Sequence, residues 1–340
     1  MAYCVLSIGI VGLPNVGKST LFNALTKKGV PAENYPFCTI DPSVGIVPVP
    51  DDRVQKLSDF SKSAKTIPAV IEFVDIAGLV AGASKGEGLG NKFLANIRET
   101  DAILHMVRVF EDKDVIHVAN KIDPLFDVGV INLELILSDL EIVNKRLESN
   151  SRDQKRGVKE AVVLHEALEK IKTALENEVM AKDVPLEDQE RSLVALLNLI
   201  TMKPMLYALN TSAANENNPP AGGKEIRKEL NGPYVEIDPV FETGFENMIK
   251  ACYELLNLET YFTTGVDETR AWTIKVGSTA PIAGTAIHTD FKDKFIRAEV
   301  INWQTLIDAG SHAEARNKGL IRTEGKEYVV KDGDVIEFLI

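Results

Sequence analysis

The feature that most constrains the fold of this chain is the run from Gly12 to Ser19, which separates two segments of different periodicity. The segment before it, Val5–Val11, is a nearly continuous apolar run of strand length, typical of a buried parallel strand. The segment after it, Lys18–Lys27, places its leucine and phenylalanine side chains on one face of a helix. A strand, a loop and a helix in this order predict an α/β fold.

The run fits the pattern G-x-x-x-x-G-K-[ST], which predicts a loop that binds phosphate. Its glycines allow backbone N–H groups to point inward at phosphate oxygens. Lys18 supplies positive charge to the β and γ oxygens, and the Ser19 hydroxyl is a ligand for Mg²⁺. The helix N-terminus adds partial positive charge. The sequence therefore predicts a P-loop domain that binds and hydrolyses a nucleoside triphosphate.

A second buried strand, Val70–Ile76, contains the expected partner of this loop. Asp75, near the end of that strand, is predicted to reach the Mg²⁺ shell through water. Gly78 is predicted to place its N–H at the γ-phosphate, and Thr39 is the natural second Mg²⁺ ligand from its chemistry and position. Leu79 follows, where familiar GTPases carry a glutamine that orients the attacking water. Either another group positions the water, or hydrolysis is slow.

Two histidines are candidates for that role. His105 lies inside the predicted strand Ala102–Val109, where a histidine is more often a core residue. His117 lies beyond the strand end, on the side where loops face the nucleotide, and is the favoured residue for orienting water. Arg98, beside the glycine-rich segment that follows Asp75, is interpreted as a solvated surface residue.

The base-reading position has two candidates. Asn120-Lys121-Ile122-Asp123 spells the N-K-x-D of guanine-specific proteins, a motif that follows a parallel strand. Only Phe110–Asp114 separate the strand that ends near Val109 from Val115–Ala119, the segment before the motif, and these are too few for a helical crossover. The next parallel strand is predicted at Met205–Leu209, so the reader is Asn210. Guanine offers donors that favour a carboxylate, whereas this segment has Ala213 where the carboxylate belongs. We therefore expect ATP to bind more strongly than GTP.

Two heptad seams predict an inserted antiparallel helical hairpin. Apolar residues step by three and four from Leu133 to Leu147, and again from Ala161 to Leu175, with the polar stretch 148–157 between them. A pair of ordinary amphipathic helices packed on the domain is the alternative. A further helix is expected at Leu193–Ile200, and a strand at Val235–Val240. From about Thr260, short strands and turns predict a separate α+β module, with strands at Ala271–Val276, Phe295–Ile301, Tyr328–Val330 and Val335–Ile340.

Charge, cysteine content and hydropathy limit the partners and the cellular compartment expected for this chain. The net charge of −12 argues against a strongly basic nucleic-acid binder, so any such contact is local, for example through Lys292, Lys294 and Arg297 or the hairpin tip 152–156. The three cysteines are widely scattered, which favours a reducing, cytoplasmic compartment. The sequence has no apolar stretch of the ~18 residues that would span a membrane.

Together these residues resemble the YchF family of Obg-related P-loop ATPases, also called Obg-like ATPases. The specific part is Phe73–Val80 continuing into Gly82–Asn91, and the resemblance covers nearly the whole chain. It implies a GTPase-like P-loop domain (1–130 and 200–258), the hairpin (131–199) and a C-terminal α+β domain of the β-grasp (TGS) type (259–340). It also implies a monomer that prefers ATP to GTP and associates with the ribosome, through its large subunit, in translation and stress responses.

The resemblance adds residue roles by motif. The segment from Asn15 to Thr20 lines the phosphates, comprising Asn15, Val16, Gly17, Lys18, Ser19 and Thr20. Thr39 binds Mg²⁺ together with Ser19, and Thr211 contacts the base through its backbone. In related proteins that lack the catalytic glutamine, an asparagine at position 15 helps to hold K⁺ near the phosphates. The chain departs from the family at Ala213, often glutamate there, and is shorter between Val240 and Thr243, where the last base-contacting motif is expected.

Overall fold

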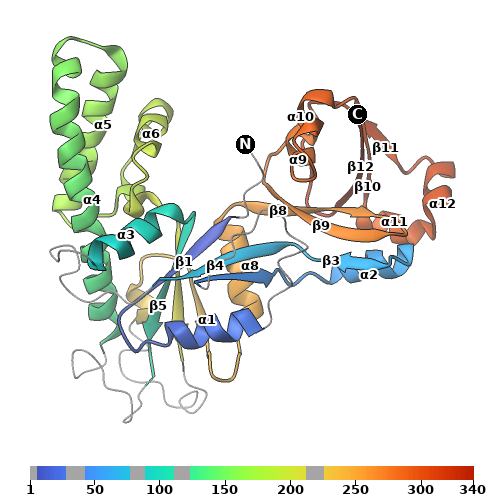
Figure 1. The fold of residues 1–340 in the computed structure, drawn as a ribbon, viewed down its shortest axis with the longest axis horizontal. Helices are drawn as coiled ribbons and strands as arrows, with labels where there is room; N and C mark the ends of the chain where they lie inside the picture. The colour runs from blue at the N-terminus through green and yellow to red at the C-terminus, as the bar shows by residue number, and fades with distance from the viewer. Residues whose placement is uncertain (1–5, 28–42, 77–88, 111–122, 212–225) are drawn as a thin grey trace. The chain divides into compact units, whose positions relative to one another are not determined.

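The computed structural model describes residues 6–27, 43–76, 89–110, 123–211 and 226–340. The chain divides into two compact units, one of residues 1–6, 25–73 and 245–340, the other of residues 7–24 and 74–244. Figure 1 shows the elements of both units. The division into two units does not test the three predicted domains (1–130 with 200–258, 131–199 and 259–340), whose boundaries stay a prediction.

The second unit is built on parallel strands. Its strands β1 (Ser7–Val11), β5 (Ala102–Arg108), β6 (Met205–Asn210) and β7 (Tyr234–Ile237) lie in that order. All three neighbouring pairs are parallel, with β5 and β6 in register from Ile103 opposite Met205 to Arg108 opposite Asn210. Strand β6 therefore follows β5 across the sheet through a long helical crossover, as the topology argument predicted. Strand β7 ends before Pro239, which stands in a turn.

Two helices accompany these strands. Helix α1 (Lys18–Lys27) begins directly after the phosphate loop, at the predicted residue, and buries Leu21 and Leu25. Helix α3 (Leu89–Glu99) precedes β5 along the chain. The strand–loop–helix order is therefore confirmed, since α1 has its predicted bounds and β1 ends at the predicted Val11, although it begins at Ser7. Both elements carry strong local periodicity.

The inserted helices form an antiparallel hairpin, as predicted. Helix α4 (Pro124–Lys155) packs against α5 (Lys159–Glu176), and in Figure 1 the two stand side by side and extend beyond the strands of their unit. Val143, Leu147, Leu168 and Ile171 are part of their shared core. The connection between the two helices is shorter than the expected polar stretch 148–157, because α4 continues to Lys155. Near this end of the hairpin, the buried Asn150 donates from Nδ2 to the Ala161 carbonyl at 2.7 Å.

The hairpin also packs on its own unit, as the alternative interpretation expected of both helices. The first half of α4 contacts β5 and buries Ile131 and Leu135, which leaves Leu133, a predicted seam residue, 41% exposed. A short helix α6 (Asp188–Ala195) packs on α5 instead of the helix expected at Leu193–Ile200. Its start is set by a capping box of Glu187 and Glu190, which the apolar pattern does not reveal. Two 3₁₀ turns, η3 (Ala181–Asp183) and η4 (Ile200–Met202), complete this region.

The first unit contains a mixed sheet in the order β11-β10-β12-β8-β9-β3. Its strands are β8 (Leu258–Thr264), β9 (Glu268–Lys275), β10 (Arg297–Asn302), β11 (Arg322–Glu324), β12 (Asp334–Leu339) and β3 (Lys65–Ile67). The helices of this unit are α2 (Asp52–Ser61), α8 (Phe245–Leu255), α9 (Ala280–Gly284), α10 (Asp290–Lys294), α11 (Trp303–Ala309) and α12 (His312–Asn317). Strands β2 (Val44–Pro48) and β4 (Val70–Asp75) are neighbours in the other sheet.

Parts of this unit differ from the sequence expectation. The predicted strand Tyr328–Val330 is only an isolated bridge between Val329 and Thr279, and β11 was not predicted. Strand β3 pairs in parallel with β9, so a segment near residue 65 joins strands two hundred residues later in the chain.

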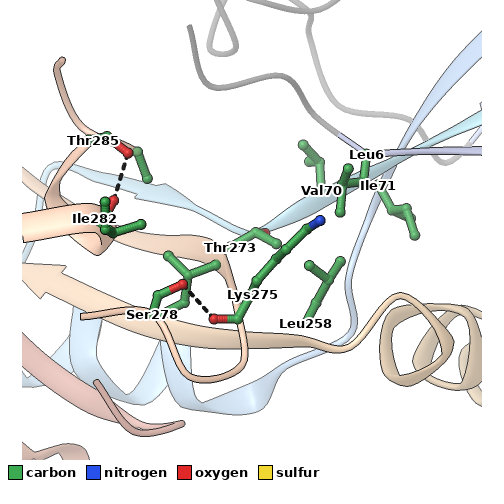
Figure 2. A pocket seen from close by; sticks show the side chains of 11 residues that line it. Leu6, Val70, Ile71, Leu258, Thr273, Lys275, Ser278, Ile282 and Thr285 are labelled. Carbon is green, nitrogen blue, oxygen red and sulfur yellow. Dashed lines mark hydrogen bonds between the residues drawn. The ribbon is translucent and has the colours of Figure 1, made fainter. Parts of the chain in front are cut away.

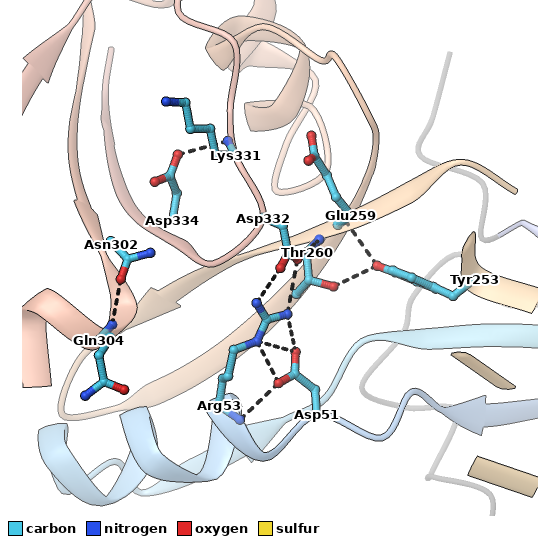
Figure 3. Close-up of polar contacts among 10 residues, drawn as sticks. All are labelled: Asp51, Arg53, Tyr253, Glu259, Thr260, Asn302, Gln304, Lys331, Asp332 and Asp334. Atoms are coloured by element: carbon cyan, nitrogen blue, oxygen red, sulfur yellow. Dashed lines mark hydrogen bonds and ion pairs between the residues drawn. The ribbon is translucent and has the colours of Figure 1, made fainter. Parts of the chain in front are cut away.

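A polar network supports this joining. Arg53 of α2 binds both Asp51, the helix N-cap, and Asp332, at 2.8 and 2.5 Å (Figure 3). The carboxylate of Asp332 also accepts the Thr260 backbone N–H at 3.1 Å. One guanidinium therefore ties the start of α2 to β8 and to the turn before β12.

Candidate nucleotide site

The phosphate loop of the second unit is held partly by its own lysine. Lys18 is 7% exposed, and its Nζ donates to the carbonyl oxygens of Gly12 at 3.0 Å and Leu13 at 2.7 Å. Burial lowers the pKa of Lys18 to about 8, and the charge of Asp75 partly counters this. The ammonium group is therefore held inside the loop by two carbonyl oxygens, and it is only partly solvated.

Two glycines of the loop are required by close backbone packing. Gly12 has φ of 152°, and a Cβ there would lie 2.5 Å from the Met106 carbonyl oxygen of β5. Gly17 has φ of 100°, and a Cβ there would lie 2.6 Å from Nδ2 of Asn210. Side chains at these positions would clash with the neighbouring strands β5 and β6, so the loop can lie this close to them only with glycine.

Asn210 connects the end of β6 to the loop. It is buried, and its Nδ2 donates to the Val16 carbonyl oxygen at 2.8 Å. Thr211 follows, with its N–H donating to the Ile237 carbonyl at 2.9 Å. The sequence argument placed Asn210 at the base-reading position. The structure also gives its amide a positioning contact, which a local motif does not reveal because Val16 is 194 residues away.

Asp75 supplies a carboxylate to the same unit. Its Oδ1 is buried and has no hydrogen-bond partner among the described residues. Burial raises the pKa of Asp75, and the opposite charge of Lys18 partly offsets this. Ser19 and Thr20 are exposed in the first turn of α1. A buried carboxylate oxygen without a partner and an accessible hydroxyl are oxygen donors of the kind that Mg²⁺ prefers, so these residues fit the ion.

Two family models match this chain. The model described as "50S ribosome-binding GTPase" matches residues 7–139, and the C-terminal YchF-GTPase model, described as a protein of unknown function, matches residues 258–340. Among curated proteins, "Ribosome-binding ATPase YchF" of Bacillus subtilis is 48% identical over 98% of each chain. The protein of that name from Haemophilus influenzae is 49% identical over 97% of this chain and 98% of its own. The chain belongs to the YchF family.

A solved structure agrees with this assignment. The structure titled "Structure of the Schizosaccharomyces pombe YchF GTPase" covers 100% of this chain and 99% of its own, at 34% identity and a TM-score of 0.87. A GTP-binding protein from Pyrococcus horikoshii has a TM-score of 0.59 at 19% identity, which shows a shared fold. The predicted class, a P-loop GTPase-like domain with an inserted hairpin and a C-terminal α+β domain, is confirmed for this YchF-family chain.

Of the guanine-type motif at residues 120–123, the structure describes only Asp123, and it gives this residue a structural role. Asp123 is the N-cap of α4, and its carboxylate accepts the Phe126 N–H at 3.3 Å. Pro124 follows at the first helical position, where its missing N–H has no cost. Asp123 therefore begins a helix of the hairpin in this YchF-family chain, which supports the interpretation of the motif as a coincidence.

His105 is a buried residue of β5, as the sequence interpretation expected. It is 1% exposed, and its ring centroid lies 5.3 Å from that of Tyr207 on β6. Its Nδ1 has no hydrogen-bond partner among the described residues. Burial, helped by the charge of Lys18, lowers the pKa of His105 to about 3, so the ring is neutral near pH 7. A neutral histidine buried in this way is a packing group of the sheet.

Arg98 differs from its interpretation as a solvated surface residue. Its guanidinium lies 2.7 Å from Asp139 Oδ1 and donates to Ser138 Oγ at 2.8 Å. Its backbone carbonyl accepts from Asn198 Nδ2 at 2.7 Å and Lys203 Nζ at 3.0 Å. A residue at the end of α3 therefore links that helix to the base of the hairpin, through partners about forty and one hundred residues away.

Several predicted site residues lie outside the described parts of the chain. They are Thr39, Gly78, Leu79, His117 and Ala213. Their predicted roles stay predictions. Of the three cysteines, Cys4 and Cys38 also lie outside, and Cys252 is buried as a free thiol. Within the described residues, no helix is long and apolar enough to cross a membrane.

The first unit contains a separate apolar cavity of about 230 Å³ (Figure 2). Leu6, Val70, Ile71 and Leu258 are among its lining residues. The hydroxyls on its rim are used locally, because Ser278 donates to the Lys275 carbonyl and Thr285 to the Ile282 carbonyl, each at 2.6 Å. The lining includes no residue of the phosphate loop.

Proposed function

We propose that this chain is a Mg²⁺-dependent ATP hydrolase that binds the ribosome through its large subunit and acts in translation and stress responses. The observation that carries the proposal is that the buried Lys18 ammonium interacts electrostatically with Asp75, whose Oδ1 has no hydrogen-bond partner among the described residues. That arrangement offers positive charge for phosphate oxygens and a negative group for the metal that accompanies them.

Each residue of the loop has a defined task in this proposal. Backbone N–H groups from Asn15 to Thr20 bind the phosphates, and Lys18 neutralises the β and γ oxygens. Ser19 and Thr39 would hold Mg²⁺ directly, and Asp75 would hold it through water. The ion would supply positive charge to the phosphate oxygens. The Gly78 N–H binds the γ-phosphate. Asn15 helps to hold a K⁺ ion beside the γ-phosphate. Equal rates of turnover in Na⁺ and in K⁺ would exclude this role for Asn15.

The attacking water needs a positioning group other than residue 79, because leucine has no hydrogen-bonding atom in its side chain. We assign this role to His117. Replacing His117 with alanine is expected to reduce hydrolysis at least tenfold, on the order expected for a general base or water-positioning group, while ATP binding is retained. Unchanged turnover would remove His117 from the mechanism.

The choice of ATP over GTP rests on the base-reading segment. Asn210 and Thr211 lie at the end of β6, and residue 213 is an alanine that cannot accept the guanine donors. The relatives from B. subtilis and H. influenzae are named ATPases, whereas the S. pombe structure is titled a GTPase. Equilibrium binding of labelled ATP and GTP to the purified protein with Mg²⁺ decides between these. Tighter GTP binding would assign the chain as a GTPase.

The ribosome partner follows from the names of the relatives and the description of the family model. We propose that the chain works in the cytoplasm as a monomer, with the P-loop domain at 1–130 and 200–258, the hairpin at 131–199 and the TGS domain at 259–340. Co-sedimentation with large ribosomal subunits tests the partner. The wild type with ATP is expected to bind, and a Lys18→Ala variant that lacks nucleotide is expected to bind less.

A nucleotide-gated adaptor with negligible hydrolysis is the second candidate, because Leu79 replaces the usual glutamine. The His117→Ala variant separates the two. If ribosome binding and release require turnover, the variant stays bound with ATP. If it binds and releases as the wild type does, nucleotide occupancy alone controls the cycle.

A further inference from the structure

The apolar cavity of the first unit is large enough to hold a small organic ligand. Its volume is about 230 Å³. An apolar cavity of about 150 Å³ holds one benzene molecule, so this cavity has room for an apolar group of about six to nine carbon atoms. Buried side chains such as Val70, Ile71 and Leu258 line it. An apolar group that enters the cavity therefore leaves water for an apolar surface that is already formed.

Strands β8 and β9 place one cation on this lining. The two strands are antiparallel, with Lys275 directly opposite Leu258, so both side chains lie on the same face of the sheet. Figure 2 shows the Lys275 side chain extending from β9 toward Val70 and Ile71. Among the described residues that line the cavity, Lys275 alone is charged. The lining therefore combines an apolar interior with one positive charge.

The other polar side chains of the lining have partners in the protein. The hydroxyls of Ser278 and Thr285 each donate to a backbone carbonyl three residues earlier, and Thr273 forms a hydrogen bond with the Tyr253 hydroxyl. The ammonium group of Lys275, by contrast, has no hydrogen-bond or ion-pair partner in the parts of the chain that the structure describes. Lys275 is thus the side chain of the lining that is left to donate to a ligand.

We propose that this cavity binds a monocarboxylate whose apolar tail or ring has about six to nine carbon atoms, such as a medium-chain fatty acid. The tail lies against Val70, Ile71 and Leu258, and the carboxylate accepts from the Lys275 ammonium. A single negative charge balances the single positive charge of the lining, whereas a cationic head group would be repelled. This site is distinct from nucleotide binding, because its lining includes no residue of the phosphate loop.

Titration of the full-length protein with octanoate, followed by isoleucine-methyl NMR, tests the place of binding. The methyl signals of Ile71, Ile274 and Ile282, which line the cavity, are expected to shift along one saturation curve with a dissociation constant below about 1 mM. Those of Ile136 and Ile171, in the core of the hairpin, are expected to stay unchanged. No saturable shift at the lining residues, or equal shifts in the hairpin, would overturn the site.

A series of carboxylates tests the size of the cavity by calorimetry. From butanoate to octanoate, the affinity is expected to rise about three- to fourfold for each added methylene, because each one leaves water. Beyond about nine carbon atoms the affinity is expected to stop rising, since the cavity is then full. An affinity that continues to rise through dodecanoate would identify unspecific adsorption to apolar surface and would overturn the proposal.

Replacing Lys275 tests the charge. Lys275→Met keeps a long unbranched side chain and is expected to weaken octanoate about 3- to 10-fold, while the affinity for octan-1-ol, which carries no charge, stays within twofold. Lys318→Met, at an exposed lysine of the same unit outside the lining, is the matched control and is expected to bind both ligands as the wild type does. Wild-type affinity of Lys275→Met for octanoate, or equal losses for both ligands, would overturn the role of the ammonium. ATP binding is expected to be the same in all three proteins.

Discussion

Arg98 and Asp139 form a partly buried ion pair between α3 and α4, with 2.7 Å between the Arg98 Nη1 and Asp139 Oδ1 atoms. Asp139 is fully buried, and its other carboxylate oxygen accepts both the N–H and the hydroxyl of Thr201 at 2.7 Å. The pair thus joins the helix that follows the Asp75 segment to the base of the hairpin and to η4. Three segments distant in sequence meet at one carboxylate.

Removing Arg98 is expected to destabilise the second unit strongly. Arg98→Ala leaves the Asp139 charge buried without its cation, which costs about 3–5 kcal/mol of unfolding free energy. Lys145→Ala, which breaks the exposed Lys145–Glu141 pair, is the control and is expected to cost less than about 0.5 kcal/mol. Urea unfolding of both variants measures the difference. Similar small costs would contradict a structural role for the Arg98–Asp139 pair.

ATP affinity is expected to fall as pH rises above about 8. The free protein holds Lys18 with a pKa of about 8, lowered by burial, so above that pH the loop loses the charge that attracts phosphate. The association constant should then fall by up to about tenfold per pH unit, with a proton taken up on binding. Calorimetry in two buffers of different ionisation enthalpy measures that uptake.

Lys18→Arg provides the control for this pH dependence. A guanidinium stays charged throughout the range, so ATP binding by the variant, even if weaker, is expected to be flat between pH 7 and 9.5. A variant that loses affinity along the same curve as the wild type would assign the titration to another group.

Replacing Asp75 with asparagine is expected to raise the Mg²⁺ concentration needed for ATP binding by about 10- to 100-fold, as for other groups that hold a metal through water. The stability of the nucleotide-free protein should not fall, because the variant removes a buried carboxylate whose pKa burial raises and whose Oδ1 has no partner among described residues. Titration of Mg²⁺ at fixed ATP measures the first effect and thermal unfolding the second. Asp188→Asn, at an exposed carboxylate, should change neither.

His105 is expected to make the fold sensitive to acid. Its pKa of about 3 in the folded state lies below the ordinary value of 6.5, so the unfolded chain binds more protons between these values, and stability falls as pH drops below about 6.5. His105→Phe should remove roughly 2–3 kcal/mol of the stability lost between pH 7 and pH 4.5. Urea unfolding at both pH values measures this. The exposed His288→Phe variant should show the acid sensitivity of the wild type.

The sequence predicted elements with strong local periodicity well. Helix α1 matches its predicted bounds, β5 and β6 differ from theirs by one residue, and α5 buries all the apolar positions of its seam. Elements whose ends depend on polar capping were shifted, as at α6 with its Glu187–Glu190 box. Short strands in the C-terminal part were missed or misplaced, because three residues carry too little pattern to define a strand.

By itself, the sequence determined the phosphate loop, its flanking strand and helix, the antiparallel hairpin and the P-loop fold. These follow from patterns within about thirty residues, where each residue's environment repeats with the period of its own element. Only the tertiary structure decided that Asn210 donates to the Val16 carbonyl, that Arg98 pairs with the buried Asp139, and that β3 pairs with β9. The reason is that hydrogen bonds and ion pairs between distant segments depend on the path of the whole chain, which leaves no periodic trace in the residues that make them.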